Sequence, residues 1–162
     1  MMQTEVLNKS QTHLPIEQRD YMHLNGTVLA FDFGEKRIGV AMGETITKIA
    51  HPLETIAAEQ NEVKFAKIKA LSLAWQPVLL VVGLPTHLDG TPHAMTVLAK
   101  KFAQRLAGRF NLPVTMMDER LTSEEAALML KEQGVGGKKQ KVSIDQVAAQ
   151  IILQSYFDQL KN

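Results

Sequence analysis

The stretch Leu29–Ala41, LAFDFGEKRIGVA, decides the fold because it joins two apolar runs by a short polar link. The first run, Thr27–Phe33, lies between Gly26 and Gly34 and is too short for a helix, so it predicts a buried strand. The second run, Ile38–Met42, follows almost at once. Two such runs that close together indicate a β-hairpin.

The chain on either side of this hairpin predicts an α/β fold. Lys48–Ile56 suits a third strand, which either lies at an edge of the sheet or ends early because Pro52 cannot donate to a neighbour. Further strands are predicted at Val78–Val82 and Val114–Met117, and helices at 63–74, at 94–106, from Thr122 to Gly134 and from Ser143 onward. This order favours a five-stranded mixed sheet, with a three-stranded antiparallel meander, two parallel strands and helices on both faces.

Apolar residues at helical spacing predict the buried stripes of the first and last helices. The first stripe comprises Val63, Ala66, Ala70, Leu71 and Ala74; the last comprises Ile144, Val147, Ala148, Ile151, Ile152 and Ser155.

Composition restricts the class of protein. The chain has 162 residues, 45% of them hydrophobic, a net charge of +1 and no cysteine. The absence of cysteine excludes a disulfide scaffold, a zinc finger and a cysteine nucleophile.

We predict a single domain at 26–162 after a flexible or loosely docked extension at 1–25. The longest apolar run, Val78–Leu84, is far below the ~18 residues of a membrane span. A cytoplasmic protein without a membrane partner is expected.

Three carboxylates stand where the predicted fold gathers its strand ends. Asp32 lies inside an apolar strand, Glu119 follows the fifth strand, and Asp145 opens the last helix. Parallel strands end at one edge of a sheet, where open α/β sheets bind ligands. Asp32 could instead cap the following turn or pair with Lys36 or Arg37, since structural ion pairs also use carboxylates.

Gathered in one cleft, these three carboxylates predict a metal site. Their mutual repulsion opposes folding, and Mg²⁺ or Mn²⁺ would remove that cost because hard cations take oxygen ligands. Two such ions ~3.5–4 Å apart can activate water and stabilise a leaving oxygen in phosphodiester cleavage. We therefore expect two ions, with Asp32 contacting both and Glu119 and Asp145 each holding one.

Four ordered motifs resemble the YqgF family. They are the opening stretch Leu29–Ala41, Val82-Gly-Leu-Pro85 with Asp89-Gly90, Asp118-Glu-Arg-Leu-Thr-Ser123, and the segment Asp145–Tyr156. The resemblance implies an RNase H-like fold, a likeness to Holliday junction resolvases and, for bacterial members, a role in maturing the 5′ end of 16S rRNA. Asp32, Glu119 and Asp145 match the family's acidic positions.

Basic residues supply candidate phosphate contacts. Those nearest the motifs are Lys36, Arg37, Arg120, Lys138, Lys139 and Lys141. Two helical clusters, Lys64/Lys67/Lys69 and Lys100/Lys101/Arg105/Arg109, fit either phosphate contacts or solvated helix faces.

The sequence favours a metal-dependent endonuclease that processes the 5′ end of precursor 16S rRNA. Structured RNA and the small ribosomal subunit precursor are the expected partners. Holliday junction resolution on branched DNA is the alternative and calls for a dimer, whereas a monomer suffices for RNA. A further alternative is a catalytically silent RNA-binding module, and the intact set of three carboxylates argues against it. A sugar-kinase-like ATPase is disfavoured because such proteins need two lobes.

Overall fold

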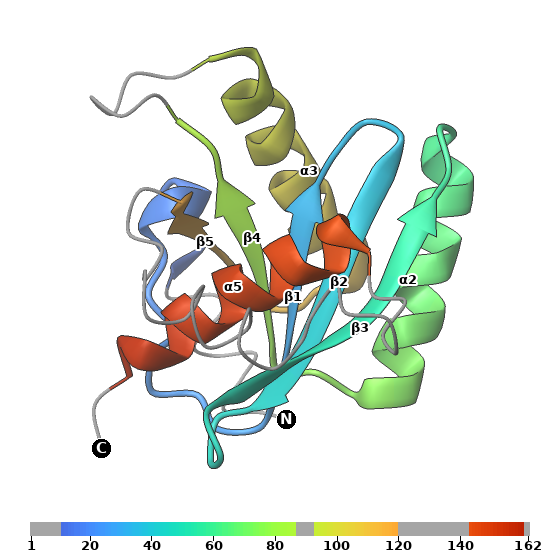
Figure 1. The fold of residues 1–162 in the computed structure, drawn as a ribbon. Helices are drawn as coiled ribbons and strands as arrows, with labels where there is room; N and C mark the ends of the chain where they lie inside the picture. The colour runs from blue at the N-terminus through green and yellow to red at the C-terminus, as the bar shows by residue number, and fades with distance from the viewer. Residues whose placement is uncertain (1–10, 87–92, 120–142, 161–162) are drawn as a thin grey trace.

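The computed structural model describes residues 11–86, 93–119 and 143–160. A short 3-10 helix, η1 (Ile16–Gln18), precedes the sheet (Figure 1). The remaining elements are β1 (Thr27–Phe33), β2 (Arg37–Glu44), β3 (Ile49–Ala57), α2 (Asn61–Trp75), β4 (Leu79–Leu84), α3 (Ala94–Phe110), β5 (Val114–Asp118) and α5 (Ile144–Asp158). The predicted helix from Thr122 to Gly134 lies outside the described residues.

The sheet has the predicted topology. Its five strands follow the order β3-β2-β1-β4-β5. The β1–β2 and β2–β3 pairs are antiparallel, whereas β4 runs parallel to both β1 and β5. The mixed sheet is therefore confirmed, and β3, which contains Pro52, lies at an edge as expected. The carboxyl ends of β1, β4 and β5 meet at one edge of the sheet.

Helices cover both faces of the sheet, because the strands alternate their apolar side chains between two cores. On one face, Leu29 and Phe31 pack with residues of α2 and α3. On the other face, Val28 and Ala30 pack with residues of α5. Figure 1 shows α5 across the near face and α2 and α3 behind the sheet. Asp32, by alternation, belongs to the α5 face.

Glycines in β2 let α5 lie directly on the sheet. A Cβ atom added to Gly39 would stand 1.8 Å from the Asp145 carbonyl oxygen and 3.0 Å from the Gln146 nitrogen. Further along, a Cβ on Gly43 would stand 2.6 Å from a ring carbon of Phe157. Glycine inside a strand often marks such a close approach of another backbone. These two positions set how closely the two ends of α5 can pack.

A row of glutamines also ties α5 to β3. Gln150 donates from Nε2 to the Ala50 carbonyl at 3.0 Å. The side chain of Gln154 accepts from the Ala50 N–H at 3.0 Å and donates to the Lys48 carbonyl at 2.9 Å. An exposed strand edge carries unpaired backbone groups, and these side chains satisfy part of that need.

The predicted helical stripes are partly wrong. Val63 and Ile144 are 40% and 86% exposed, respectively. The buried residues of α2 are instead Lys64, Phe65, Ile68 and Leu71. The buried residues of α5 are Ala149, Gln150, Ile152, Leu153, Ser155, Tyr156 and Phe157. Helical spacing allows several overlapping stripes, and the bulky aromatic residues rather than the alanines and valines decide which one faces the sheet.

Part of the segment expected to be flexible or loosely docked is packed in the structure. Ile16, Tyr21 and Leu24 are buried in the two cores. The hydroxyl of Thr115 in β5 also donates to the Arg19 carbonyl at 2.5 Å. Burial of such side chains offsets the conformational entropy that the segment loses. The division into residues 1–25 and 26–162 itself stays a prediction.

Among the helices that the structure describes, none combines the length and the apolar character needed to cross a membrane.

The close packing of α5 on Gly39 can be tested with two glycine substitutions that should change the free energy of unfolding in opposite directions. Gly39→Ala should lower the free energy of unfolding by about 1–3 kcal/mol, since the new methyl group meets backbone atoms that have no free space. Gly108→Ala in α3 meets no atom within 4 Å and should raise it by about 0.5–1 kcal/mol through helix propensity. Urea unfolding measures both changes; a neutral Gly39→Ala would contradict the close packing.

Candidate active site

Asp32 and Asp145 meet where α5 begins. Asp32 pairs with Gly39 across the β1–β2 ladder. The backbone of Asp145 packs on that same glycine, since an added Cβ would strike its carbonyl oxygen. Thr55 and Ser143 share a hydrogen bond of 2.6 Å between their hydroxyl oxygens, and this contact ties the N-cap of α5 to β3. Asp145 is therefore held beside Asp32 by backbone contact and by side-chain hydrogen bonding.

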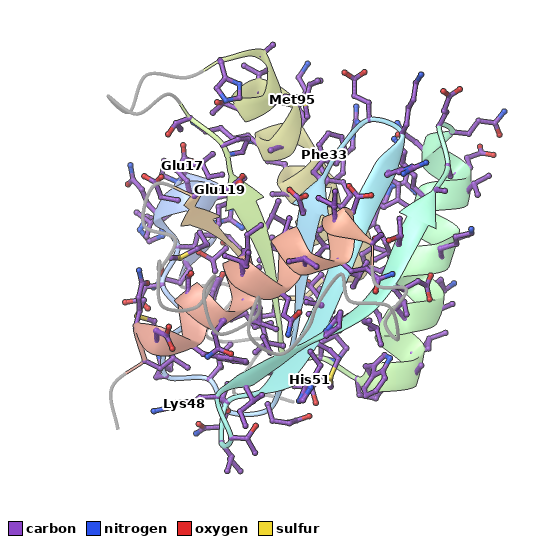
Figure 2. All side chains as sticks on the ribbon, in the orientation of Figure 1. Glu17, Phe33, Lys48, His51, Met95 and Glu119 are labelled. Carbon is purple, nitrogen blue, oxygen red and sulfur yellow. The ribbon has the colours of Figure 1, made fainter. Side chains whose placement is uncertain are left out.

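Glu119 reaches the same place from β5. It directly follows the last residue of that strand, Asp118. A Cβ added to Gly83 of β4 would lie 3.1 Å from Glu119 Oε2 and 2.5 Å from Ile152 Cδ1. The carboxylate thus lies over β4, the parallel neighbour of β1, beside α5. Figure 2 labels Glu119 at this end of β5.

The electrostatics show that the three carboxylates interact. Burial raises the pKa of the Asp32 carboxyl to about 6, and the negative charge of Asp145 adds to the rise. Burial raises the pKa of Glu119 to about 7, with further contributions from the charges of Asp32 and Asp118. The charge of Asp145 disfavours ionisation of Asp32, and the charges of Asp32 and Asp118 disfavour ionisation of Glu119. The structure therefore brings Asp32, Glu119 and Asp145 into one acidic cluster, with Asp32 between the other two.

Asp118 is an acidic neighbour whose role the sequence did not single out. It is the last residue of β5, and its charge contributes to the raised pKa of Glu119. Only a weak signal pointed to it, the adjacent pair Asp118-Glu119. Gly39 and Gly83 were also missed as determinants of the site. Glycine inside an otherwise apolar strand was the available signal for both.

The donor chemistry of the cluster fits a divalent cation. Carboxylate oxygens are the ligands that Mg²⁺ and Mn²⁺ prefer, and a bound cation would stabilise the ionised forms of these partly buried carboxylates. Within residues 11–86, 93–119 and 143–160, no group of three His, Asp or Glu side chains is arranged to hold a metal ion. The interactions instead join Asp32 pairwise to Asp145 and to Glu119.

The two basic residues of the hairpin, Lys36 and Arg37, lie on opposite faces of the sheet. Lys36 lines a pocket together with Phe33, on the α2 and α3 side of the sheet. Arg37 begins β2 two residues before Gly39, so strand alternation places it on the side of Asp32. Both side chains are exposed. The other predicted nucleic-acid contacts, Arg120, Lys138, Lys139 and Lys141, lie outside the described residues.

Comparison with known proteins decides the family. Residues 26–159 match the RuvX family, described as Holliday junction resolvase. This chain belongs to the RuvX family. The resemblance to the YqgF family is thereby confirmed, since RuvX and YqgF denote the same family.

Curated relatives and solved structures agree with this membership. A relative from Methylobacillus flagellatus, named "Putative pre-16S rRNA nuclease", is 63% identical over 83% of this chain and 92% of its own length. A relative of the same name from Dechloromonas aromatica is 64% identical over 82% of this chain and 91% of its own. RuvC from T. thermophilus, solved in complex with a Holliday junction substrate, has a TM-score of 0.56 at 14% identity. It covers 82% of this chain and 93% of RuvC. That likeness confirms the RNase H-like fold.

The raised pKa values predict a stability that falls with rising pH in metal-free buffer. Asp32 and Glu119 bind protons more tightly in the folded than in the unfolded chain. Stability that is present at about pH 4 should therefore be lost progressively up to about pH 7 and stay constant above it. Asp32→Asn, which removes a repelled charge, should raise the free energy of unfolding at pH 7.5 by about 1–2 kcal/mol.

Thermal unfolding at pH 5 and pH 7.5 in a chelating buffer measures both effects. Added Mg²⁺ should raise the melting temperature of the wild type at pH 7.5 and leave Asp32→Asn nearly unchanged. A wild type more stable at pH 7.5 than at pH 5 would contradict the strain assigned to this cluster.

Proposed function

We propose that this RuvX-family protein is a divalent-metal-dependent nuclease that processes the 5′ end of precursor 16S rRNA. One observation carries the proposal. Asp32, Glu119 and Asp145, drawn from a central strand, from the end of an edge strand and from a helix, form one acidic cluster. Burial and the charges of neighbouring carboxylates raise the pKa values of Asp32 and Glu119 within it. The names of the curated relatives support the choice of RNA.

The proposed cofactor is Mg²⁺ or Mn²⁺, bound as two ions. Asp32 would contact both ions, and Glu119 and Asp145 would each hold one. When bound, the ions supply an activated water and stabilise the leaving oxygen. The chain itself supplies a rigid frame. Asp32 is fixed by its pairing with Gly39 of β2, in a strand that also pairs with β4, and Asp145 is fixed by the contact of its backbone with Gly39. By analogy with RNase H-like chemistry, the products carry a 5′-phosphate and a 3′-hydroxyl.

Arg37 is proposed to contact the nucleic-acid backbone on the side of Asp32, since it is exposed and shares that face. Lys36 is proposed to contact a phosphate on the opposite face. Arg120, Lys138, Lys139 and Lys141 stay proposed contacts from the sequence. Phosphate contacts position a substrate without reading its bases, which suits an enzyme that recognises structured RNA within a small ribosomal subunit precursor. The cytoplasm is the proposed compartment, because that precursor would be its substrate.

The second candidate function is Holliday junction resolution. The description of the matching family favours it. A resolvase makes two symmetric cuts, which a homodimer would place, whereas end processing of RNA can be done by a monomer. The substrate and the oligomeric state therefore separate the two functions.

A side-by-side cleavage assay tests the proposal. The substrates are a 5′ segment of precursor 16S rRNA and a synthetic four-way DNA junction, each with Mg²⁺ and with Mn²⁺. We expect cleavage of the RNA, and Asp32→Asn should lower its rate by at least about 100-fold, since a metal ligand is lost. Asp158→Asn, which changes the same charge at the far end of α5, is the matched control and should leave the rate unchanged.

Three results would count against the proposal. Paired symmetric cuts in the junction, without cleavage of the RNA, would favour the resolvase. Full activity of Asp32→Asn would overturn the assignment of the site. Binding of RNA without cleavage under either metal would favour the catalytically silent module.

A further inference from the structure

Lys64 is a buried lysine that has no carboxylate partner among the residues that the structure describes. Its side chain lies in α2, and the residue is only 5% exposed. The ammonium donates to the Glu35 carbonyl at 2.6 Å and lies 5.6 Å from the centre of the Phe33 ring. No described carboxylate forms an ion pair with it. Burial of a charge is costly unless it is compensated, and an ammonium can donate three hydrogen bonds. Within residues 11–86, 93–119 and 143–160, the hydrogen bond to the Glu35 carbonyl uses one of these donors, which leaves two for a ligand.

This lysine lines a pocket of about 290 Å³ beside the end of β1, here named the β1-end pocket. Lys36 from the β1–β2 turn and Arg105 from α3 line it as well. Three cations from three segments of the chain thus face one cavity. Two carboxylates, Glu35 and Glu59, also line it, but both residues are exposed. Solvent screens exposed charges far more than buried ones, so the buried ammonium favours an anion.

The first turn of α2 adds to this preference. Asn61, the first residue of the helix, lines the pocket. The N-cap residue, Gln60, makes no side-chain capping hydrogen bond, so its side chain satisfies none of the backbone N–H groups of the first turn. A helix N-terminus carries a partial positive charge and favours anions. The pocket therefore joins a buried ammonium, two exposed cations and a helix N-terminus.

The pocket and the acidic cluster lie on opposite faces of the same strand end. Phe33, which lines the pocket, directly follows Asp32 in β1. Successive side chains of a strand point to opposite faces, so Asp32 belongs to the α5 face and Phe33 to the face of α2 and α3. Figure 2 labels Phe33 near this end of β1. A nucleic-acid strand that crosses the end of β1 would meet both.

We propose that the β1-end pocket binds a backbone phosphate of the RNA, away from the phosphate that is cleaved. The buried Lys64 ammonium binds the phosphate inside the pocket, and the exposed side chains of Lys36 and Arg105 bind it from the solvent side. The subsite anchors the strand on one face of the sheet while the acidic cluster holds the reacting phosphate on the other. This inference rests on the proposed function, since it deepens how the same substrate is held.

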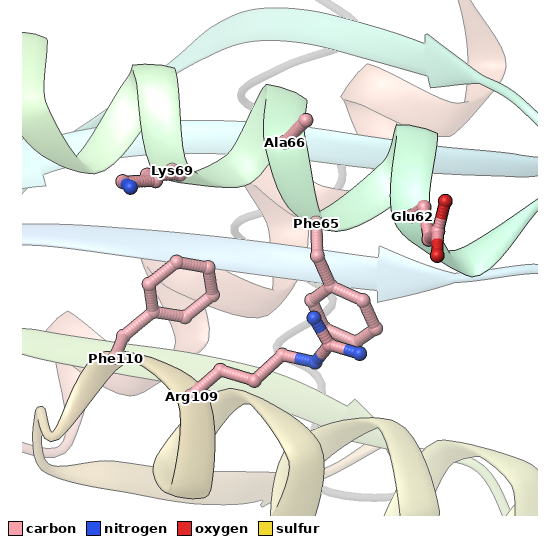
Figure 3. Close-up of a pocket in the computed structure, with 6 residues that line it drawn as sticks. All are labelled: Glu62, Phe65, Ala66, Lys69, Arg109 and Phe110. Carbon is pink, nitrogen blue, oxygen red and sulfur yellow. The ribbon is translucent and has the colours of Figure 1, made fainter.

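A second pocket on the same side of the sheet provides the contrast. It has a volume of about 430 Å³ and lies between α2 and α3 (Figure 3). Its cations, Lys69 and Arg109, are exposed, and the Arg109 guanidinium lies 4.2 Å from the centre of the Phe65 ring. Its lining has no buried cation. A phosphate there would contact only exposed cations, whose attraction is screened by salt.

RNA binding measured without cleavage tests the subsite. All proteins carry Asp32→Asn, and a fluorescent single-stranded RNA of mixed sequence is titrated in a chelating buffer at several salt concentrations. The test variant combines Lys36→Ala with Arg105→Ala. The matched control combines Lys69→Ala with Lys101→Ala, which removes the same charge from exposed positions outside the β1-end pocket.

The test pair should weaken binding by about 10-fold and reduce the slope of log K against log salt by about 0.7, the value for one lost phosphate contact on a single strand. The control pair should change the affinity by less than about 2-fold. Equal losses in both pairs, or no loss in the test pair, would overturn the subsite.

Lys64→Met provides an independent variant because it keeps the aliphatic stem and removes the buried charge. It should weaken binding as the test pair does, with a circular dichroism spectrum like that of the parent. If it fails to fold, the exposed test pair still decides the question.

These binding data are separable from the cleavage assay. A selective loss in the test pair, together with no cleavage by the wild type, would leave the subsite standing and the nuclease function overturned. Cleavage by the wild type with no selective loss would overturn the subsite alone.

Discussion

The contact between the first turn of α5 and Gly39 is the constraint on which the site depends. Backbone packs on backbone there, with no space for even one methyl group. Gly39 is also the ladder partner of Asp32, so the same contact fixes where Asp145 stands relative to Asp32. The glutamine row along β3 and the Thr55–Ser143 hydrogen bond prevent the helix from sliding along the sheet.

The two cores allow this protein to hold charges that oppose its folding. Apolar side chains on both faces of β1 supply the burial free energy, while the carboxylates gather where the strands end. Burial, together with repulsion between neighbouring carboxylates, raises the pKa values of Asp32 and Glu119. Stored electrostatic strain at a cleft is typical of functional sites. A bound cation would convert that strain into affinity for the metal.

Strand alternation divides the chemistry between two faces. Asp32 and Phe33 are neighbours in β1, yet one joins the acidic cluster and the other lines the β1-end pocket. Lys64 links the second face to the hairpin through its hydrogen bond to the Glu35 carbonyl. The turn between β1 and β2 is consequently tied to α2 by this hydrogen bond, while α5 covers one face of β1. Both faces can therefore act on one substrate without competing for space.

The sequence by itself determined the strands, their order along the chain and their mixed parallel and antiparallel arrangement, and it singled out the three acidic positions that stay the predicted site. Short apolar runs bounded by glycine and proline, such as Thr27–Phe33, leave little choice but a buried strand. A carboxylate inside such a run, Asp32, marks the site because its burial needs compensation.

Only the tertiary structure decided which helix faces are buried and how closely α5 packs on Gly39. It also decided that Lys64 is buried and lines one pocket with Lys36 and Arg105. In the sequence, Lys64 looked like one member of a surface cluster with Lys67 and Lys69. These features depend on contacts between residues far apart in the chain. Local spacing carries no information about such contacts, because the same periodicity permits several buried stripes and the shape of the sheet selects one of them.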